Sequence, residues 1–233
     1  PIRWHLYGYG RPTTPCVESL GDAVIVFSNV TAAAVYTAQA IPLMMTPATL
    51  EEPDDMRYSF SQVLASLGFR ATLFSNQERM GRFSAPGSVV FAGCEELVFL
   101  NETNRQGVWY DDALLPYLTR ELSASGEGHP KVVFLHLKGS HVTTAERYPP
   151  DFAPFDVTPM RRSREWVDMA KMSGHYDNSI AFTDRLLGEV VKTLQKKNGP
   201  AWMIYLPDHG DTPDAEGWRT VTSRQMWEVP MVV

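Results

Sequence analysis

The sequence predicts an α/β fold in which a mostly parallel sheet is sandwiched by helices. Apolar runs of strand length alternate along the chain with segments whose apolar residues recur at helical spacing. Strands and helices that alternate in this way form parallel sheets, because each crossover helix packs back on to the sheet. The 233 residues, 44% of them hydrophobic, are enough to bury one such core. We therefore expect a single domain over residues 1–233.

Composition excludes several classes of function. The formal net charge is −6, and there is no block rich in Lys and Arg, so nucleic acid is not an expected partner. No window approaches the roughly 18 consecutive apolar residues that a membrane span needs, and the first residues do not form a signal peptide. The two cysteines, Cys16 and Cys94, lie far apart in the chain, so they either pair or stay reduced.

The first third of the chain is expected to form two strands and two helices. Residues 23–28 are a continuous apolar run, which is typical of a strand buried on both faces. Small residues then lead into a helix that ends near residue 46, with Pro42 early enough to be tolerated. In residues 60–67 apolar side chains recur at i, i+3, i+4 and i+7, which indicates a helix with one face toward the core. Residues 70–74 are the next strand.

The middle of the chain holds the clearest strand. The segment before it is irregular, with a short strand expected at residues 89–91 and a helix at residues 112–122, whose leucines share one face. The apolar run at residues 131–137 is the strand. A Pro-rich segment at residues 148–159 is long for a connection, which favours a functional or lid-like loop.

The last third is expected to add one long helix and two strands. Apolar residues recur at helical spacing over residues 176–194, and apolar runs of strand length follow at residues 201–206 and 228–233. Because the last run reaches the end of the sequence, we expect the fold to be truncated there.

Three of the expected strands are followed by polar clusters: Ser75-Asn76-Gln77, Lys138-Gly139-Ser140-His141 and Asp208-His209. The carboxyl ends of parallel strands share one edge of a sheet, where α/β proteins build their sites. The sequence therefore predicts that these clusters meet in an active site.

The segment Asp208-His209-Gly210 suits a divalent metal ion. Aspartate supplies a hard oxygen, histidine a nitrogen, and glycine lets the backbone turn so that both side chains face one point. An Asp-His pair is common by chance, however, and a turn that merely ends a strand is the alternative.

Seven segments in collinear order resemble the periplasmic catalytic domain of the phosphoethanolamine transferases. They are residues 6–15, 28–31, 74–77, 135–141, 176–180, 208–210 and 227–233. This family lies in the alkaline phosphatase and sulfatase superfamily and includes enzymes that modify lipid A. The resemblance implies an alkaline phosphatase/sulfatase-like fold, here truncated at both ends and cut from a longer membrane-anchored protein.

The resemblance also implies a zinc enzyme with a threonine nucleophile at Thr37. One zinc ion would be held by Thr37, Asp208 and His209, and it would raise the alkoxide fraction of the threonine hydroxyl. A fourth ligand, a glutamate, is expected upstream of Pro1 and is absent from this chain. The family's flanking cysteines are replaced by Ala33 and Leu43.

Four further residues are implied to bind substrate. His141 would contact the phosphate and move a proton, and Lys138, Asn76 and Gln77 would line the pocket. His136 is interpreted as a core histidine or a support for the site. The Asp177-Asn178 pair is interpreted as either a helix cap or a functional pair.

By resemblance, the predicted reaction is the transfer of phosphoethanolamine from phosphatidylethanolamine to lipopolysaccharide or another envelope glycan, through a phosphothreonine intermediate. The protein would sit in the inner membrane through an N-terminal segment that is not present here, with this domain in the periplasm. The alternatives are a sulfatase or phosphodiesterase on the same fold, and a catalytically silent relative kept for binding.

Overall fold

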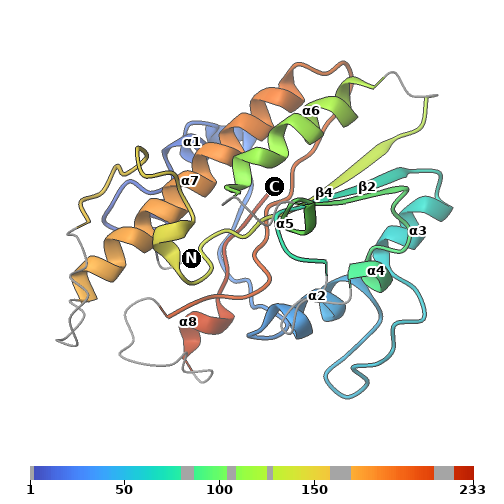
Figure 1. Cartoon of the computed structure of the whole chain (residues 1–233), viewed down its shortest axis with the longest axis horizontal. Coiled ribbons are helices and arrows are strands. Elements are labelled where there is room, and N and C mark those ends of the chain that lie inside the picture. Colours follow the sequence, from blue (N-terminus) through green and yellow to red (C-terminus); the bar gives the residue numbers. More distant parts are fainter. Residues whose placement is uncertain (1–2, 80–86, 104–108, 125–127, 158–168, 213–222) are drawn as a thin grey trace.

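The structure is a computed structural model that describes residues 3–79, 87–103, 109–124, 128–157, 169–212 and 223–233 (Figure 1). Its α-helices are α1 (Pro15–Glu18), α2 (Thr37–Met45), α3 (Phe60–Ser66), α4 (Gly87–Val90), α5 (Leu100–Thr103), α6 (Leu115–Ser123), α7 (Met169–Gln195) and α8 (Arg224–Trp227). Its strands are β1 (Val26–Phe27), β2 (Arg70–Ser75), β3 (Glu96–Phe99), β4 (Lys131–His136) and β5 (Met231–Val232). Short 3₁₀ helices are η1 (His5–Tyr7), η2 (Gly21–Ala23), η3 (Asp111–Leu114) and η4 (Thr144–Glu146).

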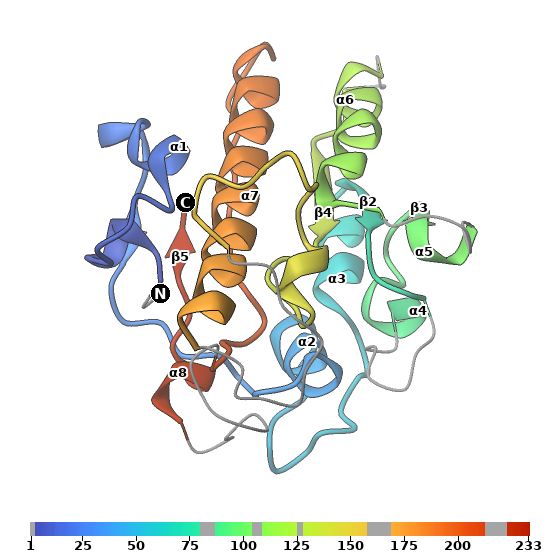
Figure 2. The same cartoon turned by 60° about the vertical axis from the view of Figure 1, so that its left-hand side comes forward.

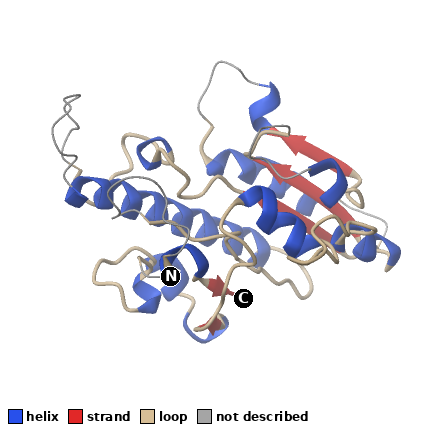
Figure 3. Ribbon diagram, turned by 90° about the horizontal axis from the view of Figure 1, so that it is seen from below, coloured by secondary structure: helices blue, strands red, loops and turns tan. Residues whose placement is uncertain are grey.

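The centre of the fold is a three-stranded parallel sheet in the order β3-β2-β4 (Figure 3). Leu73 and Phe74 are neighbours in β2, yet both are fully buried and belong to different apolar clusters. Since successive side chains of a strand point to opposite faces, both faces of the sheet are covered. The predicted α/β class, a parallel sheet between helices, is confirmed.

Each face of the sheet has its own group of helices. On one face, Ile41 of α2 and Val90 of α4 pack with Leu73. On the other, Leu100 of α5 and Leu114 of η3 pack with Phe74. Helices α6 and α7 lie side by side on this second side of the molecule (Figure 1).

A separate cluster joins both ends of the chain to α7. Trp4, Val17 and Val232 pack against Ile180 and Leu187, and Figure 2 shows α1 and β5 beside α7. The carboxylate of Asp177, which is fully buried, accepts hydrogen bonds from the side chains of Arg3, Tyr9 and Arg11. This ionic contact fixes the N-terminal loop to the same helix that reaches the site.

The predictions of strands at residues 23–28, 201–206 and 228–233 are wrong in part. Only Val26–Phe27 of the expected 23–28 strand is a strand, and it is exposed and antiparallel to β5. The 201–206 run is not a strand, because it pairs through one bridge, Tyr205 with Val232. Trp202, in that run, is 78% exposed. The expected 228–233 strand shortens to β5. A continuous apolar run indicates extended chain, but it does not specify a partner strand.

Three local predictions are also wrong. The chain forms α4 where a strand was expected at 89–91, and the missed strand is β3. The apolar stripe of α3 faces outward, with Phe60 50% and Leu67 67% exposed, while Ser61 is buried. Helix α2 runs from Thr37 to Met45, so it ends close to the expected residue 46. Helix α7 begins at Met169, so Asp177 and Asn178 lie inside it and do not cap it.

Cys16 and Cys94 are free thiols. The last two residues of the expected 148–159 loop lie outside the described residues, and residues 148–157 are irregular apart from turns. Within the described parts of the chain, no helix has both the length and the apolar character that a membrane crossing requires.

Candidate active site

A cavity of about 350 Å³ opens between the edge strand β4, the start of α2 and the segment 204–211. Six of the residues predicted for the site line this cavity: Thr37, Gln77, Lys138, His141, Asp208 and His209. They come from four stretches of the chain. The expected convergence of polar clusters at the carboxyl ends of β2 and β4 is therefore observed, and the Asp208 segment joins it although it is not a strand.

Thr37 is the first residue of α2, and Tyr36 before it is extended. Its Oγ1 lies 3.4 Å from Nε2 of His209. The helix N-terminus carries a partial positive charge, which favours an anion beside it. The hydroxyl thus lies next to an imidazole nitrogen and at a position suited to an anion.

The orientation of His209 is fixed by its own turn. Nδ1 lies 2.7 Å from the carbonyl oxygen of Gly210, and because a carbonyl can only accept, we assign the proton to Nδ1. The lone pair of Nε2 then points to the Thr37 side, and Asp208 Oδ2 lies 3.7 Å from the same nitrogen. A histidine whose other nitrogen donates to a carbonyl is the usual arrangement of a metal ligand.

The three side chains fit a zinc ion in chemistry, and the two separations from His209 are close to those of zinc ligands. A hydroxyl oxygen, a carboxylate oxygen and an imidazole nitrogen are all zinc ligands, and two ligands of one tetrahedral zinc lie about 3.3 Å apart. The separations from His209 Nε2 are 3.4 Å and 3.7 Å. Among the described residues no group of three or more His, Cys, Asp or Glu side chains is placed to hold a metal.

Lys138 and His141 lie on the loop that follows β4. Burial lowers the pKa of Lys138, and the nearby charge of Arg147 lowers it further. His141 is exposed on the cavity rim, and its Nδ1 lies 2.5 Å from the carbonyl oxygen of Val142. Gln77 donates from Nε2 to the carbonyl of Leu137 at 3.0 Å, so its amide nitrogen also holds this loop.

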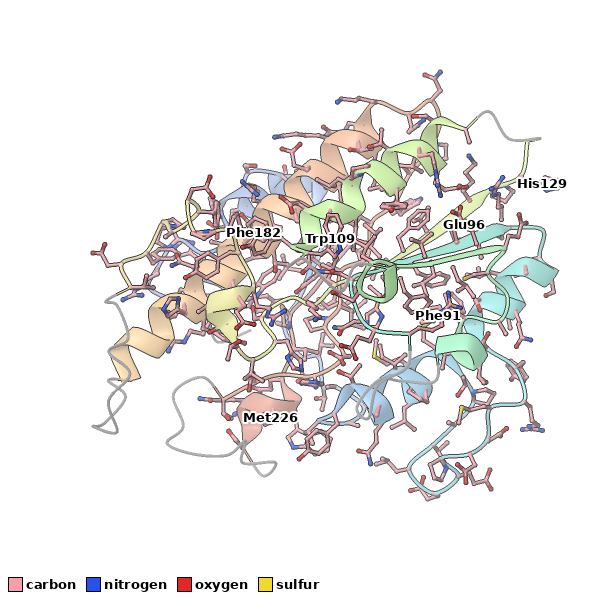
Figure 4. All side chains as sticks on the ribbon, in the orientation of Figure 1. Phe91, Glu96, Trp109, His129, Phe182 and Met226 are labelled. Carbon is pink, nitrogen blue, oxygen red and sulfur yellow. The ribbon has the colours of Figure 1, made fainter. Side chains whose placement is uncertain are left out.

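Asn76 is not among the residues that line the cavity. It is buried, and its amide nitrogen donates to the carbonyl of Trp109 at 3.1 Å and to Asp111 Oδ1 at 2.8 Å. Trp109 is labelled near the middle of the view in Figure 4, and it is 38% exposed. The structure thus differs from the expectation that Asn76 contacts substrate, because its amide group is used inside the protein.

Two cavity residues were missed or placed differently by sequence reasoning. His136, interpreted as a core or supporting histidine, lines the cavity; its Nδ1 lies 3.2 Å from the hydroxyl oxygen of Ser75. Burial lowers the pKa of His136, and the charge of Asp208 opposes that effect. The sequence could have indicated that His136 lines the site, because His136 is the last residue of a strand and the site lies at the carboxyl ends of strands. Arg3 also lines the cavity, and no local motif indicates this.

The sequence of this chain is similar to those of known proteins. Residues 2–233 match the sulfatase family. The putative transferase YhbX of Escherichia coli K12 is 29% identical over 98% of this chain and 40% of its own length. The phosphoethanolamine transferase EptC of the same organism is 26% identical over 91% of this chain and 38% of its own length. The chain thus spans about two-fifths of the length of these curated relatives.

The fold is also similar to a solved structure. The C-terminal periplasmic domain of EptC from Escherichia coli, in complex with zinc, superposes with a TM-score of 0.85 at 23% identity. That likeness covers 99% of this chain and 68% of the other.

Proposed function

The chain belongs to the sulfatase family, and from this premise we propose that it is the catalytic domain of a phosphoethanolamine transferase with Thr37 as its nucleophile. The observation that carries the proposal is the 3.4 Å separation between Thr37 Oγ1 and His209 Nε2 at the start of α2. The names of the relatives support the choice of reaction, since EptC is a phosphoethanolamine transferase.

We propose that Thr37, Asp208 and His209 hold the zinc ion. When bound, zinc would lower the pKa of the threonine hydroxyl and offset the negative charge of the phosphate. The zinc complex of the EptC domain supports this cofactor. The Gly210 carbonyl keeps His209 in the tautomer that presents Nε2, and the backbone N–H of His209 donates to Asp208 Oδ1 at 3.0 Å.

The reaction then proceeds in two displacements. Thr37 loses its hydroxyl proton to solvent, and its oxygen forms a bond to the phosphorus of phosphatidylethanolamine. The bond from phosphorus to the glyceride oxygen breaks, and diacylglycerol leaves with a proton from the imidazolium of His141. In the second step the acceptor hydroxyl gives its proton to that imidazole and its oxygen bonds to phosphorus. The bond from phosphorus to the Thr37 oxygen breaks, and that oxygen takes a proton back from solvent.

The remaining cavity residues bind the charged group. Lys138 lines the cavity, and its ammonium group is suited to the phosphate oxygens. The N-terminus of α2 faces the same group. Both contacts favour the extra negative charge that develops on the phosphate oxygens in the transition state.

The proposal includes location and partners. The donor is phosphatidylethanolamine and the acceptor is a lipopolysaccharide or another envelope glycan. The protein works at the inner membrane with this domain in the periplasm, as the name of the EptC domain supports.

A sulfatase with a cysteine-derived nucleophile is disfavoured. Neither Cys16 nor Cys94 lines the described cavity. Cys16 packs against Gly188 of α7, and Cys94 packs against the cluster on one face of the sheet. A hydrolase that uses Thr37 remains the alternative that an assay must separate.

The test is a transfer assay with zinc, lipopolysaccharide, and vesicles of phosphatidylethanolamine labelled in its ethanolamine. The label is expected on lipopolysaccharide with the unaltered protein and with the control Thr31→Ala, since Thr31 is exposed and does not line the cavity. Thr37→Ala is expected to abolish transfer. Full transfer by Thr37→Ala would overturn the proposal, and label found only as free phosphoethanolamine would identify the hydrolase instead.

A further inference from the structure

The loop 137–141 forms one wall of the cavity and is anchored from three other parts of the chain. Gln77 donates to the carbonyl of Leu137 at 3.0 Å, and the hydroxyl oxygens of Ser140 and of Ser179 on α7 lie 2.8 Å apart, within hydrogen-bond distance. The middle of the loop is held by the side chain of Asp111, from η3. The loop therefore takes its position from tertiary contacts as well as from β4.

Asp111 contacts the loop at two consecutive residues. The backbone N–H groups of Lys138 and Gly139 donate to its two carboxylate oxygens, each at 2.8 Å. Gly139 has a φ of 55°, the left-handed conformation that lets consecutive N–H groups converge on one anion. Hydrogen bonds to a charged acceptor are about twice as strong as those between neutral groups.

The side chain of Asp111 is buried, and its carboxylate is hydrogen-bonded inside the protein. Asp111 is 3% exposed, and Asn76 donates to its Oδ1 at 2.8 Å. The pKa of Asp111 is raised, with burial as the largest cause, while the hydrogen bonds from Asn76, Lys138 and Gly139 and the charge of Arg147 act in the opposite direction. Asp111 does not line the cavity, so any effect on the substrate passes through other residues.

The contact with Asp111 also affects His141, because a tight turn links Lys138 to His141. The N–H of His141 donates to the carbonyl of Lys138 at 3.3 Å, so a fixed position for Lys138 also fixes the backbone of His141. Lys138 and His141 are the two residues on this loop that the proposed function assigns to the phosphate.

The geometry points to Asp111 as a positioning residue that holds the loop 137–141. Asn76 supports Asp111, and the fixed loop lets Lys138 and His141 face the reacting phosphate. This inference rests on the proposed function for its kinetic consequences, whereas the anchoring itself is independent of it. It also gives Asn76 a role that fits its buried position.

The test compares Asp111→Asn with the control Asp112→Asn. The substituted asparagine would keep the shape of the aspartate side chain but present an amide N–H₂ to the backbone donors. Asp112 is the next residue, with a side chain 40% exposed and paired to Arg185. Hydrogen exchange of the 137–141 peptide and the kcat and KM of transfer are measured for both variants. In Asp111→Asn we expect the amides of Lys138 and Gly139 to exchange at least about tenfold faster.

The kinetic expectation separates positioning from general stability. In Asp111→Asn, kcat is expected to fall by about ten- to hundredfold because the proton donor is misplaced. KM for the lipid is expected to change by less than about threefold, and the exchange of β2 and α7 peptides to stay unchanged. Asp112→Asn is expected to match the unaltered protein in both measurements. Unchanged loop exchange, or unchanged kcat with a loosened loop, would overturn the inference.

A second pair of variants covers the case in which Asp111→Asn does not fold. Gly139→Ala strains the left-handed position from the loop side, and an added Cβ would meet nothing within 4 Å. Gly128→Ala, at φ 77° and with equally open surroundings, is its control. Gly139→Ala alone is expected to loosen the loop and lower kcat, and equal effects from both variants would contradict the inference. If the unaltered protein transfers nothing, the proposed function fails, while the exchange data still decide whether Asp111 anchors the loop.

Discussion

The hydroxyl oxygen of Thr37 lies 3.4 Å from Nε2 of His209, a residue 172 positions further along the chain. Helix α2 delivers the first group, and the turn after Pro207 delivers the second. The two residues share a cavity wall only because α2 packs on the sheet while the 204–211 segment lies opposite β4. The folded chain thus places an imidazole nitrogen beside the hydroxyl of Thr37.

Zinc should stabilise the folded protein through His209. A ligand that binds only the folded state at a concentration about a hundredfold above Kd adds about 2.7 kcal/mol. For a domain of this size that corresponds to a rise of roughly 5–10 °C in Tm. The melting temperature of protein freed of metal by a chelator, measured with and without added zinc, checks this.

The variant His209→Ala is expected to lose the rise in Tm, whereas His129→Ala should keep it. His129 is exposed and lies at the outer edge of the molecule, far from α2 (Figure 4). An equal zinc effect in both variants would show that the ion binds elsewhere.

Gly210 should tolerate no side chain. A Cβ at this position would collide with the carbonyl oxygen of Gln225, and the N–H of Gly210 donates to the carbonyl of Met226 on α8 at 2.9 Å. Gly210→Ala must therefore push the Asp208-His209 turn away from α8. We expect a loss of about 1–3 kcal/mol in the free energy of unfolding, together with weaker zinc binding.

The control for this substitution is Gly10→Ala, where an added Cβ would meet nothing within 4 Å. Urea unfolding and zinc titration of the two variants give the comparison. If Gly210→Ala matched Gly10→Ala in both, the turn would not depend on close packing with α8.

Acid should destabilise the protein partly through His136. Burial lowers the pKa of His136 below its ordinary value of 6.5 in the folded state. Between that lowered pKa and 6.5 the unfolded chain binds a proton that the folded chain does not, so stability is lost as the pH falls through this window. The free energy of unfolding, measured without metal at about pH 7.5 and about pH 5.5, reports the loss.

The variant His136→Gln should lose less stability between these two pH values than the unaltered protein does. His129→Gln is the matched control and should keep the full loss. Identical pH dependence in His136→Gln and the unaltered protein would mean that His136 does not contribute to the acid sensitivity.

The parts of the fold that the sequence predicts well have strong local signals. Strands β2 and β4 are apolar runs bounded by polar residues, and helices α6 and α7 carry long apolar stripes. Strand β3 was missed because it has only four residues and begins with a glutamate. The outward face of α3 shows that periodicity identifies a helix but not the direction in which its stripe points.

The candidate site likewise contains residues that a local sequence pattern indicates and residues that no local pattern indicates. The Asp208-His209 pair is visible as a local pattern, and the choice of Thr37 among several threonines came from the family resemblance. Asp111 could not be found from the sequence, because its role consists of hydrogen bonds to Lys138 and Gly139, 27 and 28 positions away. Such contacts arise from tertiary packing and leave no periodic signal.

The most direct test of the central claim is a search for the covalent intermediate on Thr37. The protein is mixed with zinc and phosphatidylethanolamine without an acceptor, quenched in acid, digested and analysed by mass spectrometry. We predict a phosphoethanolamine group on the peptide that contains Thr37, absent from Thr37→Ala and retained in Thr31→Ala. An adduct on a different residue, or one that persists in Thr37→Ala, would contradict the account.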